Sequence, residues 1–230
     1  MLEHLGEKLV LSFELFGFSL DLDIVTMFMS WLIMIIMILG AIWFRRGLDQ
    51  DVEEKPSSRL VILEAMIELF NDQLLGGFES EYLRKQLFSF VSTMLLFLLF
   101  ANWLSVIPPL KSPTQDLNVP FSLAILVFFM SHYYGAKING PGTYLKSFFQ
   151  PYPFMAPLNL ISEVAKPLSH SFRLFGNVFG GAVLVTVISS RLMPFVMPAL
   201  LQIFYGLFIG AIHAFVFVLL TVAYINVAVE

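Results

Sequence analysis

Five long stretches of apolar residues dominate the chain, at about 24–44, 87–107, 118–137, 155–190 and 194–226. Each reaches the roughly 20 residues that a helix needs to cross a lipid bilayer. The last two would extend about 54 Å and 50 Å as continuous helices, which exceeds the roughly 30 Å of a hydrocarbon core. The pattern predicts an all-α integral membrane protein with five spanning helices, in which the last two form a long hairpin that tilts or projects from the membrane.

Two connecting segments differ from these spans. Residues 60–75 (LVILEAMIELFNDQLL) alternate apolar residues with polar ones at spacings typical of an amphipathic helix at the membrane interface. Residues 138–153 are rich in glycine and proline, which predicts a turn-rich loop. Because no connection is long enough to bury a core of its own, we expect one membrane domain over residues 1–230.

Composition agrees with this class and excludes several others. The chain is 58% hydrophobic and has a net charge of only −4 with no basic patch, so nucleic acid is not an expected partner. It has no cysteine, and its four histidines lack a recognisable metal-ligand spacing (His4, His132, His170 and His213). We therefore expect no metal site and no cofactor. The first 23 residues lack the features of a signal peptide, so we expect the N-terminus to be retained.

Lysine and arginine are unevenly distributed between the two sides that the spans define. The segments after the first and third spans contain Arg45, Arg46, Lys55, Arg59, Arg84, Lys85, Lys137 and Lys146. The opposite side has only Lys8, Lys111 and Arg191. Because basic residues are enriched in cytoplasmic loops, this asymmetry predicts an N-terminus outside and a C-terminus in the cytoplasm.

The fourth span contains a stripe of polar residues in an otherwise apolar segment. At 100° per residue, its members fall within about 80° of one another on a helix: Asn159, Glu163, Lys166, His170, Arg173 and Asn177. The stripe rises about 27 Å, nearly the thickness of the hydrocarbon core. Charged groups at such depth are costly, and where they occur they typically mark ion paths, relays or buried partners.

Charge pairing within the helix is the structural alternative. Glu163 and Lys166 are three residues apart and can neutralise each other. Arg173 has no counter-charge within the segment, which favours the functional interpretation. Pro167 removes the N–H that would bond to the carbonyl of Glu163, so we expect a kink or a hydrated backbone at that turn, although a purely structural kink fits this residue equally well.

The fifth span has a second, weaker polar face. Relative to Gln202, residues Gly206, His213 and Tyr224 fall within about 40° and Gly210 within about 80°. Small residues permit close approach of helices in membranes, so this face can meet the stripe of the preceding span. The alternative, which fits His213 equally well, is a packing notch at the two glycines with the histidine hydrogen-bonded to a neighbour.

Three segments of the chain resemble subunit a of the F-type ATP synthases of bacteria and chloroplasts. They are PLNLISEVAKPLSHSFRLFGN at 157–177, QDLNVPFSLA at 115–124 and IHAFVFVLLTVAYI at 212–225. The essential arginine of the family's RLFGN motif corresponds to Arg173. The family's half-channel and outer-loop polar positions correspond to Asn159, Glu163, Asn177 and Asp116.

This resemblance implies a mechanism and a set of partners. In the family, ions enter by one aqueous half-channel, neutralise a carboxyl group on a rotating ring of c subunits, and leave by the other half-channel. Arg173 would separate the channels, because arginine stays protonated and favours the ionised form of a nearby carboxylate. The implied partners are the c ring, peripheral-stalk b subunits, membrane lipid and the translocated proton or sodium ion. The implied location is a bacterial plasma membrane or, alternatively, a thylakoid membrane.

The chain departs from the family's pattern at three positions. Ala182 stands where many relatives have glutamate or histidine, Gly206 where a histidine or acidic residue is common, and His213 where glutamine is usual. The entry half-channel is therefore expected to be built differently, with His170 and His213 as replacement protonatable groups. Lys166, Gln202 and Tyr224 complete the polar residues expected along the ion path.

Other classes of function fit parts of the pattern. A self-contained secondary transporter also carries charges at mid-membrane, but it typically shows repeated halves and unwound helices at a substrate site, and the sequence shows neither. A structural scaffold explains the spans and glycines without needing six aligned polar residues. An intramembrane hydrolase would need a Ser/His or paired-carboxylate arrangement, which the spacing does not provide.

Overall fold

Five long helices dominate the computed structural model, which describes residues 10–15, 18–45, 58–78, 80–107, 110–150, 152–191 and 196–229. Each of the five is long and apolar enough to cross a membrane, which confirms the predicted helical membrane fold. Four are α1 (Ile24–Arg45), α3 (Glu81–Leu104), α4 (Asn118–Asn139) and α6 (Ala156–Arg191). The fifth runs through α7 (Val196–Ile203), the π-helical segment η4 (Phe204–Ile209) and α8 (Gly210–Val229).

The helix α3 starts earlier than the apolar stretch that predicted it. It begins at Glu81 rather than near residue 87, so its first turns contain charged side chains. The Lys85 Nζ lies 2.9 Å from the Glu81 carboxylate one turn away, and Arg84 donates a 2.7 Å hydrogen bond to the carbonyl of Phe78. Hydropathy marks the part of a helix that fits the hydrocarbon core, whereas charged first turns extend the same helix beyond it.

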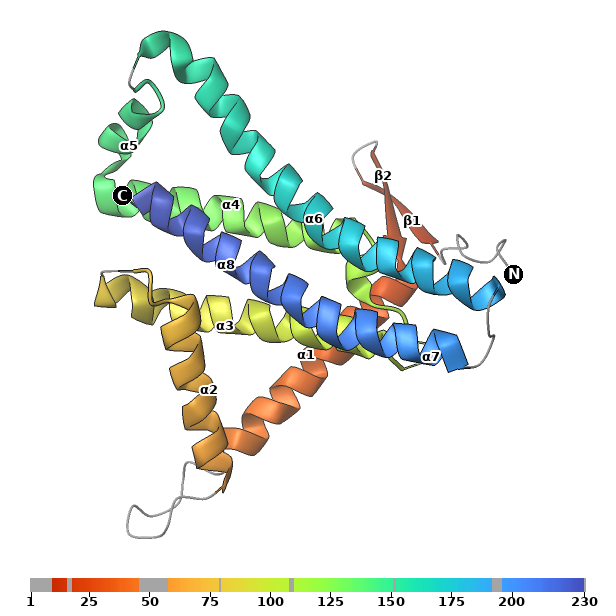
Figure 1. Cartoon of the computed structure of the whole chain (residues 1–230). Coiled ribbons are helices and arrows are strands. Elements are labelled where there is room, and N and C mark those ends of the chain that lie inside the picture. Colours follow the sequence, from red (N-terminus) through yellow and green to blue (C-terminus); the bar gives the residue numbers. More distant parts are fainter. Residues whose placement is uncertain are drawn as a thin grey trace.

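The predicted amphipathic helix is present as α2 (Ser58–Leu74), which bridges the ends of α1 and α3 (Figure 1). It buries Phe70 and Leu74 and exposes Glu64, Glu68 and Asp72. At its start, the Arg59 guanidinium lies 4.3 Å from the centroid of the Trp43 ring on α1. This cation–π contact and the buried apolar residues together fix α2 against its two neighbours.

The expected loop at 138–153 is wrong over part of its length, because it contains the short helix α5 (Pro141–Ser147), and the 3₁₀ turn η3 (Pro153–Met155) begins at its last residue. Gly140 ends α4 with a φ of 80°, a conformation that glycine adopts without strain. Pro141 then occupies the first turn of α5, where its missing N–H costs no hydrogen bond. The two residues that suggested a loop therefore end one helix and start the next.

A two-stranded antiparallel hairpin, which the sequence analysis did not anticipate, precedes α1. It consists of β1 (Val10–Leu15) and β2 (Phe18–Asp23), with Leu15 opposite Phe18 and Val10 opposite Asp23. Asp23 also caps α1, because its carboxylate accepts 3.0 Å hydrogen bonds from the Val25 N–H and the Thr26 hydroxyl. The hairpin is thus joined directly to the first membrane helix.

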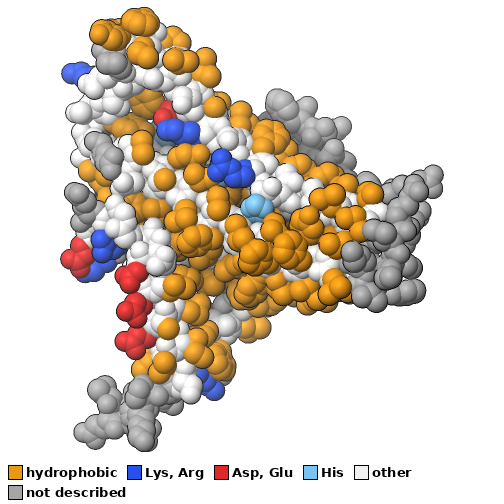
Figure 2. Space-filling model, in the orientation of Figure 1, with side chains coloured by type: hydrophobic (Ala, Val, Ile, Leu, Met, Phe, Trp, Pro, Cys, Tyr) orange, Lys and Arg blue, Asp and Glu red, His pale blue; other side chains and the backbone are white. Residues whose placement is uncertain are grey.

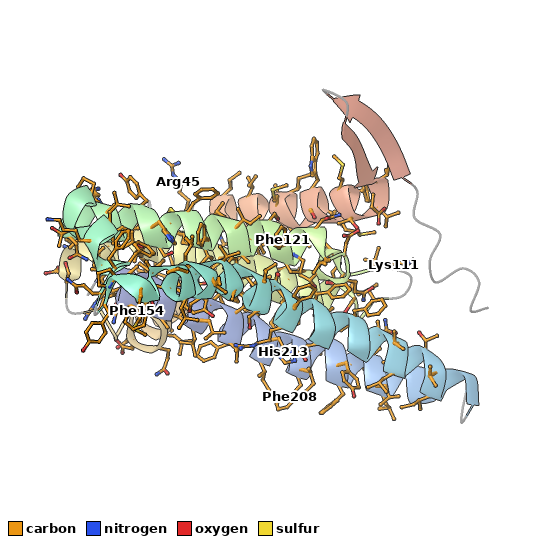
Figure 3. All side chains as sticks on the ribbon, turned by 90° about the horizontal axis from the view of Figure 1, so that it is seen from above. Arg45, Lys111, Phe121, Phe154, Phe208 and His213 are labelled. Atoms are coloured by element: carbon orange, nitrogen blue, oxygen red, sulfur yellow. The ribbon has the colours of Figure 1, made fainter. Side chains whose placement is uncertain are left out.

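The apolar core lies where α3, α4 and α8 pack together, and α6 runs obliquely across α4 and toward α7 (Figure 1). One end of the bundle, which we call the α2–α5 side, carries α2, α5 and the last turn of α8. The other, the hairpin side, carries β1, β2 and the 3₁₀ turn η2 (Pro113–Gln115). Arg45 and Lys111 lie toward opposite ends of the bundle, with His213 between them (Figure 3).

Most of the basic residues used to predict the orientation lie in the described part of the chain, on the α2–α5 side. Arg45, Arg59, Lys85, Lys137 and Lys146 belong to helix ends or connections on the α2–α5 side. Three residues of that prediction, Lys8, Arg46 and Lys55, lie outside the described residues, as does the side chain of Arg191.

Candidate functional site

The polar residues at the beginning of α6 gather around a cavity on the α2–α5 side. Glu163 and Lys166 form an ion pair across one turn, and their side chains are only 22% and 28% exposed. The Lys166 Nζ lies 5.8 Å from the centroid of the Tyr224 ring on α8. Asn159 donates hydrogen bonds of 2.8 Å and 3.1 Å to the carbonyls of Phe148 and Gln150. All four residues line one cavity of about 470 Å³.

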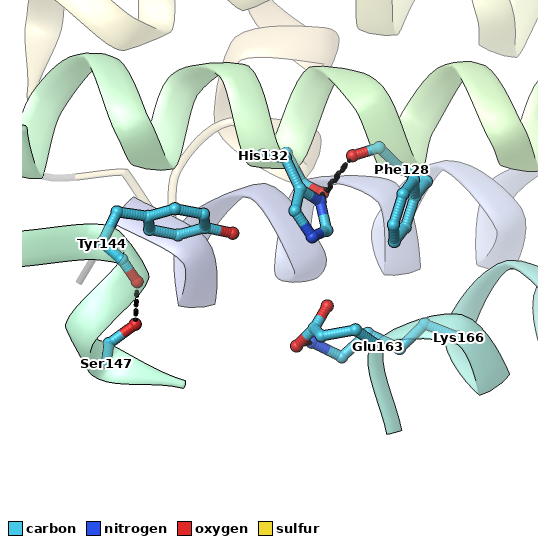
Figure 4. Close-up of polar contacts among 7 residues, drawn as sticks. Phe128, His132, Tyr144, Ser147, Glu163 and Lys166 are labelled. Atoms are coloured by element: carbon cyan, nitrogen blue, oxygen red, sulfur yellow. Dashed lines mark hydrogen bonds and ion pairs between the residues drawn. The ribbon is translucent and has the colours of Figure 1, made fainter. Parts of the chain in front are cut away.

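A second, mostly apolar cavity of about 610 Å³ adjoins this group between α4, α5 and α6. His132 and Tyr144 face Glu163 across it (Figure 4). The His132 Nδ1 lies 2.8 Å from the carbonyl oxygen of Phe128, and because a carbonyl only accepts, this nitrogen carries a proton. Burial raises the pKa of Tyr144, and the Glu163 carboxylate raises it further, so the phenol stays a neutral donor.

His132 is the polar residue of this region that the sequence analysis left without a role. Its only signal was a histidine in an otherwise apolar span, and such a signal does not say which neighbour it faces. In the structure its ring packs at 4.1 Å from the Phe128 ring and 6.2 Å from the Phe148 ring, measured between centroids. Glu163 lines two cavities, the polar one on the α2–α5 side and the mostly apolar one between α4, α5 and α6.

A separate cavity of about 260 Å³ lies on the hairpin side, between α6 and the final helix. Asn177 and His213 meet there, with 3.2 Å between the amide Nδ2 and the imidazole Nδ1. Gln202 lines the same cavity and donates a hydrogen bond to the carbonyl of Ser105. Lys111 and Gln115, from the connection between α3 and α4, also line it. The cavity therefore leads from the hairpin side toward the middle of α6.

Arg173 lies on α6 between these two groups. Along the helix axis it is about 10 Å from Lys166 and about 6 Å from Asn177, at 1.5 Å per residue. Its side chain is exposed, and within the described part of the chain it has no ion-pair partner. Phe172 and Phe179 on the same helix are exposed as well, about 100° and 120° around the helix from Arg173. Figure 2 shows this face as largely hydrophobic and white, with one histidine, a few basic side chains, some of them beside acidic ones, and a row of acidic side chains at the lower left.

His170 lines none of these three cavities. It is 1% exposed, its ring stacks on Phe217 of α8 with 3.7 Å between centroids, and its Nε2 lies 3.0 Å from the Phe217 carbonyl oxygen. The carbonyl fixes the proton on Nε2, and Nδ1 is then buried without a partner among the described residues. This environment is that of a packed helix–helix contact, and it separates His170 from the other members of the polar stripe.

Asp116 forms a capping hydrogen bond at the start of α4. It is 8% exposed, and its carboxylate accepts a 3.1 Å hydrogen bond from the N–H of Asn118, the first residue of that helix. A carboxylate at this position satisfies a free helix N–H and interacts favourably with the helix dipole. Its neighbour Gln115, rather than Asp116, is among the residues that line the hairpin-side cavity.

The two glycines of the final helix pack against α3 and the residues directly after it, not against α6 as the shared-face prediction suggested. A Cβ placed on Gly210 would lie 2.7 Å from the Cβ of Asn102, and one on Gly206 would overlap Val106. The packing-notch alternative therefore describes these glycines. Tyr224 shares a face with His213 but lies about 16 Å further along the helix, so it lines the α2–α5 cavity instead.

The chain is similar to known proteins over almost all of the region that carries these cavities. The family described as ATP synthase A chain matches residues 27–226. The chain is 33% identical over 207 residues to ATP synthase subunit a of Desulforamulus reducens, covering 87% of this chain and 78% of the relative. It is 36% identical over 200 residues to ATP synthase subunit a 1 of Crocosphaera subtropica, covering 87% and 84%. It is 31% identical over 226 residues to a protein of Propionigenium modestum named ATP synthase subunit a, sodium ion specific, covering 92% and 75%.

Proposed function

Because the chain belongs to the ATP synthase A chain family, we propose that it forms the stationary ion path of a rotary ATP synthase. In this role it carries no catalytic residue and couples the flow of protons or sodium ions across the membrane to ATP synthesis. Its mechanical partner is a rotating ring of c subunits, and peripheral-stalk b subunits and lipid surround the rest of the helix bundle.

The observation that carries this proposal is the placement of Arg173. One polar cavity reaches into the bundle from each side, and the exposed arginine lies between them on the same helix. A permanently charged side chain on an apolar face is costly in a membrane unless an acidic group approaches it. A carboxyl group on a c subunit that passes this face supplies such a partner.

Each cavity serves as one half of the path. On the hairpin side the ion passes Lys111 and Gln115, then Gln202, and reaches the Asn177–His213 pair, about one helical turn from the arginine. On the α2–α5 side it passes the Glu163–Lys166 pair and Asn159. Neither half crosses the membrane alone, so an ion must transfer to the ring to complete the crossing.

Arg173 prevents a direct passage between the halves. Its guanidinium lowers the affinity of a nearby carboxylate for a proton, because it stabilises the ionised form, and so it releases the ion on one side. Each charge moved across 100 mV is worth about 2.3 kcal/mol, and several ions per turn together supply the work of rotation. The α2–α5 side then faces the cytoplasm and the hairpin side faces outward, in a bacterial plasma membrane or a thylakoid membrane.

Replacement of Arg173 tests this function. We expect Arg173→Ala to abolish ATP-driven ion pumping in inverted vesicles while the synthase still assembles. Arg173→Lys should also lose most of the pumping, because a compact ammonium does not reproduce the planar guanidinium. The neighbouring exposed residue Phe172, changed to Leu, is the matched control for the helix surface. Normal pumping by the lysine variant would contradict the assigned role of arginine.

A further inference from the structure

A buried polar cluster joins the end of α3 to the π-helical segment η4 of the final helix. Asn102, which is 1% exposed, donates a 2.8 Å hydrogen bond from Nδ2 to the carbonyl of Gly210, the residue directly after η4. Trp103 donates a 3.4 Å hydrogen bond to the carbonyl of Leu207 within η4. Before η4, Gln202 donates to the carbonyl of Ser105. Side chains therefore connect α3 with the final helix before, within and after the π-helical segment.

The orientation of the Asn102 amide is fixed on both sides. Its Oδ1 accepts a 2.9 Å hydrogen bond from the Thr114 hydroxyl, which is itself 2.6 Å from the Ser112 hydroxyl in the η2 region. The Gly210 carbonyl can only accept, so the group facing it must be the NH₂ of the amide. A flipped amide would place two oxygens against each other. The outer connection between α3 and α4 thus determines which way Asn102 points.

The π-helical segment matters because it changes which side chains face the hairpin-side cavity. A π turn holds one more residue than an α turn, and such segments are rare and usually occur where function requires them. Conversion of η4 to a regular α-helix would rotate α8 relative to α7 by roughly 100°, which is the angle between successive residues of an α-helix. Gln202 lies before the segment and His213 after it, and both line the same cavity. A regular α-helix would place these two side chains only about 20° apart, so η4 turns His213 away from the face of Gln202. The 3.2 Å contact between the His213 ring and the Asn177 amide on α6 therefore depends on the register that η4 sets.

We propose that Asn102 is a positioning residue that holds the π-helical register and so keeps His213 against Asn177 in the hairpin-side cavity. Gly210 lets α3 approach its backbone closely, since a Cβ there would lie 2.7 Å from the Cβ of Asn102. The claim about register stands on these contacts alone. Only the consequence for ion flow rests on the proposed function.

The experiment measures labelling of single cysteines in the complete synthase in membranes, which is possible because the chain has no cysteine of its own. His213→Cys should react with a small membrane-impermeant thiosulfonate, and Ile212→Cys, on the exposed apolar surface, should not. With Asn102→Leu added, we expect labelling of His213→Cys to fall on the order of fivefold, the effect of losing one buried hydrogen bond. Labelling should appear instead at a neighbouring position, Ile212→Cys or Ala214→Cys.

Asn139→Leu is the matched control, because Asn139 donates a 3.0 Å hydrogen bond to the carbonyl of Val229 at the far end of the same helix. It should leave labelling of His213→Cys unchanged. Thr114→Val, which removes only the hydroxyl that orients Asn102, should shift labelling in the same direction by a smaller amount, and it replaces Asn102→Leu if that variant does not assemble.

Unchanged labelling at positions 212 to 214 in the Asn102 or Thr114 variant overturns the proposal. A uniform change at all three positions also overturns it, since that pattern reports general loosening rather than rotation. If labelling moves from position 213 to a neighbour while ion flux stays normal, the positioning role stands and the assignment of this cavity to the ion path fails.

Discussion

At the scale of single residues, the polar stripe on α6 separates into three environments. Glu163 and Lys166 are paired beside a cavity, His170 is buried against Phe217, and Arg173 is exposed. His170 and Arg173 are three residues apart, so their side chains project about 60° from one another around the helix. That rotation turns one toward α8 and the other toward the exposed surface. Periodicity places both on one stripe, but the position of the neighbouring helix decides which of them is covered.

The carboxylate of Glu163 gives a prediction at this scale. Glu163→Gln keeps the shape of the side chain and removes its charge, so we expect passive ion flux through vesicles stripped of the catalytic sector to fall roughly tenfold or more. Ser162→Ala alters the same cavity without removing a charge and should retain the flux. Because Glu163→Gln also leaves Lys166 without its partner, the double variant Glu163→Gln/Lys166→Gln tests whether the unpaired cation is the cause. Recovery of flux in that double variant would contradict a role for the carboxylate itself.

At the scale of elements, the final helix depends on two glycines that let α3 lie against its backbone. In Gly210→Ala the new methyl group would meet Asn102 with no free space, and overpacking of this kind typically costs about 1–3 kcal/mol. We expect less subunit to accumulate in assembled synthase. Gly40→Ala, within α1 and with no atom near its Cβ position, should accumulate normally, because alanine favours helix more than glycine does. Equal accumulation of both variants would show that the contact with Asn102 adapts at little cost.

Hydropathy and periodicity predicted the elements that the membrane dictates, but the hairpin and the π-helical segment were not predicted. The five spans follow from apolar runs long enough for a bilayer, and the structure has them. The hairpin had a signal in the alternating segment FSLDLD at 18–23, which is the period of a strand. The π-helical segment η4 has no comparable signature, because it depends on hydrogen bonds from α3 that lie about a hundred positions away in sequence. Contacts of that kind are set by packing and not by the local pattern.

At the scale of the whole molecule, two long helices divide the bundle into two accessible regions. As an unbroken helix through Pro167, α6 extends about 54 Å, and the final helix extends about 51 Å. Both exceed the hydrocarbon core, so each reaches from the α2–α5 cavity to the hairpin-side cavity. The candidate site residues were predictable because their side chains are polar in apolar spans. Their division between two cavities was not, since it depends on the placement of α4, α5 and α8.

The central claim is that the two cavities open to opposite faces of the membrane and do not connect past Arg173. Single cysteines at positions 163 and 213 in sealed vesicles of known orientation test it, with an impermeant thiol reagent added to one side at a time. We predict that Glu163→Cys reacts only from the cytoplasmic side and His213→Cys only from the outer side, whereas His170→Cys, buried against Phe217, reacts from neither. Reaction of both positions from the same side, or of either position from both sides, would contradict two separate half-channels.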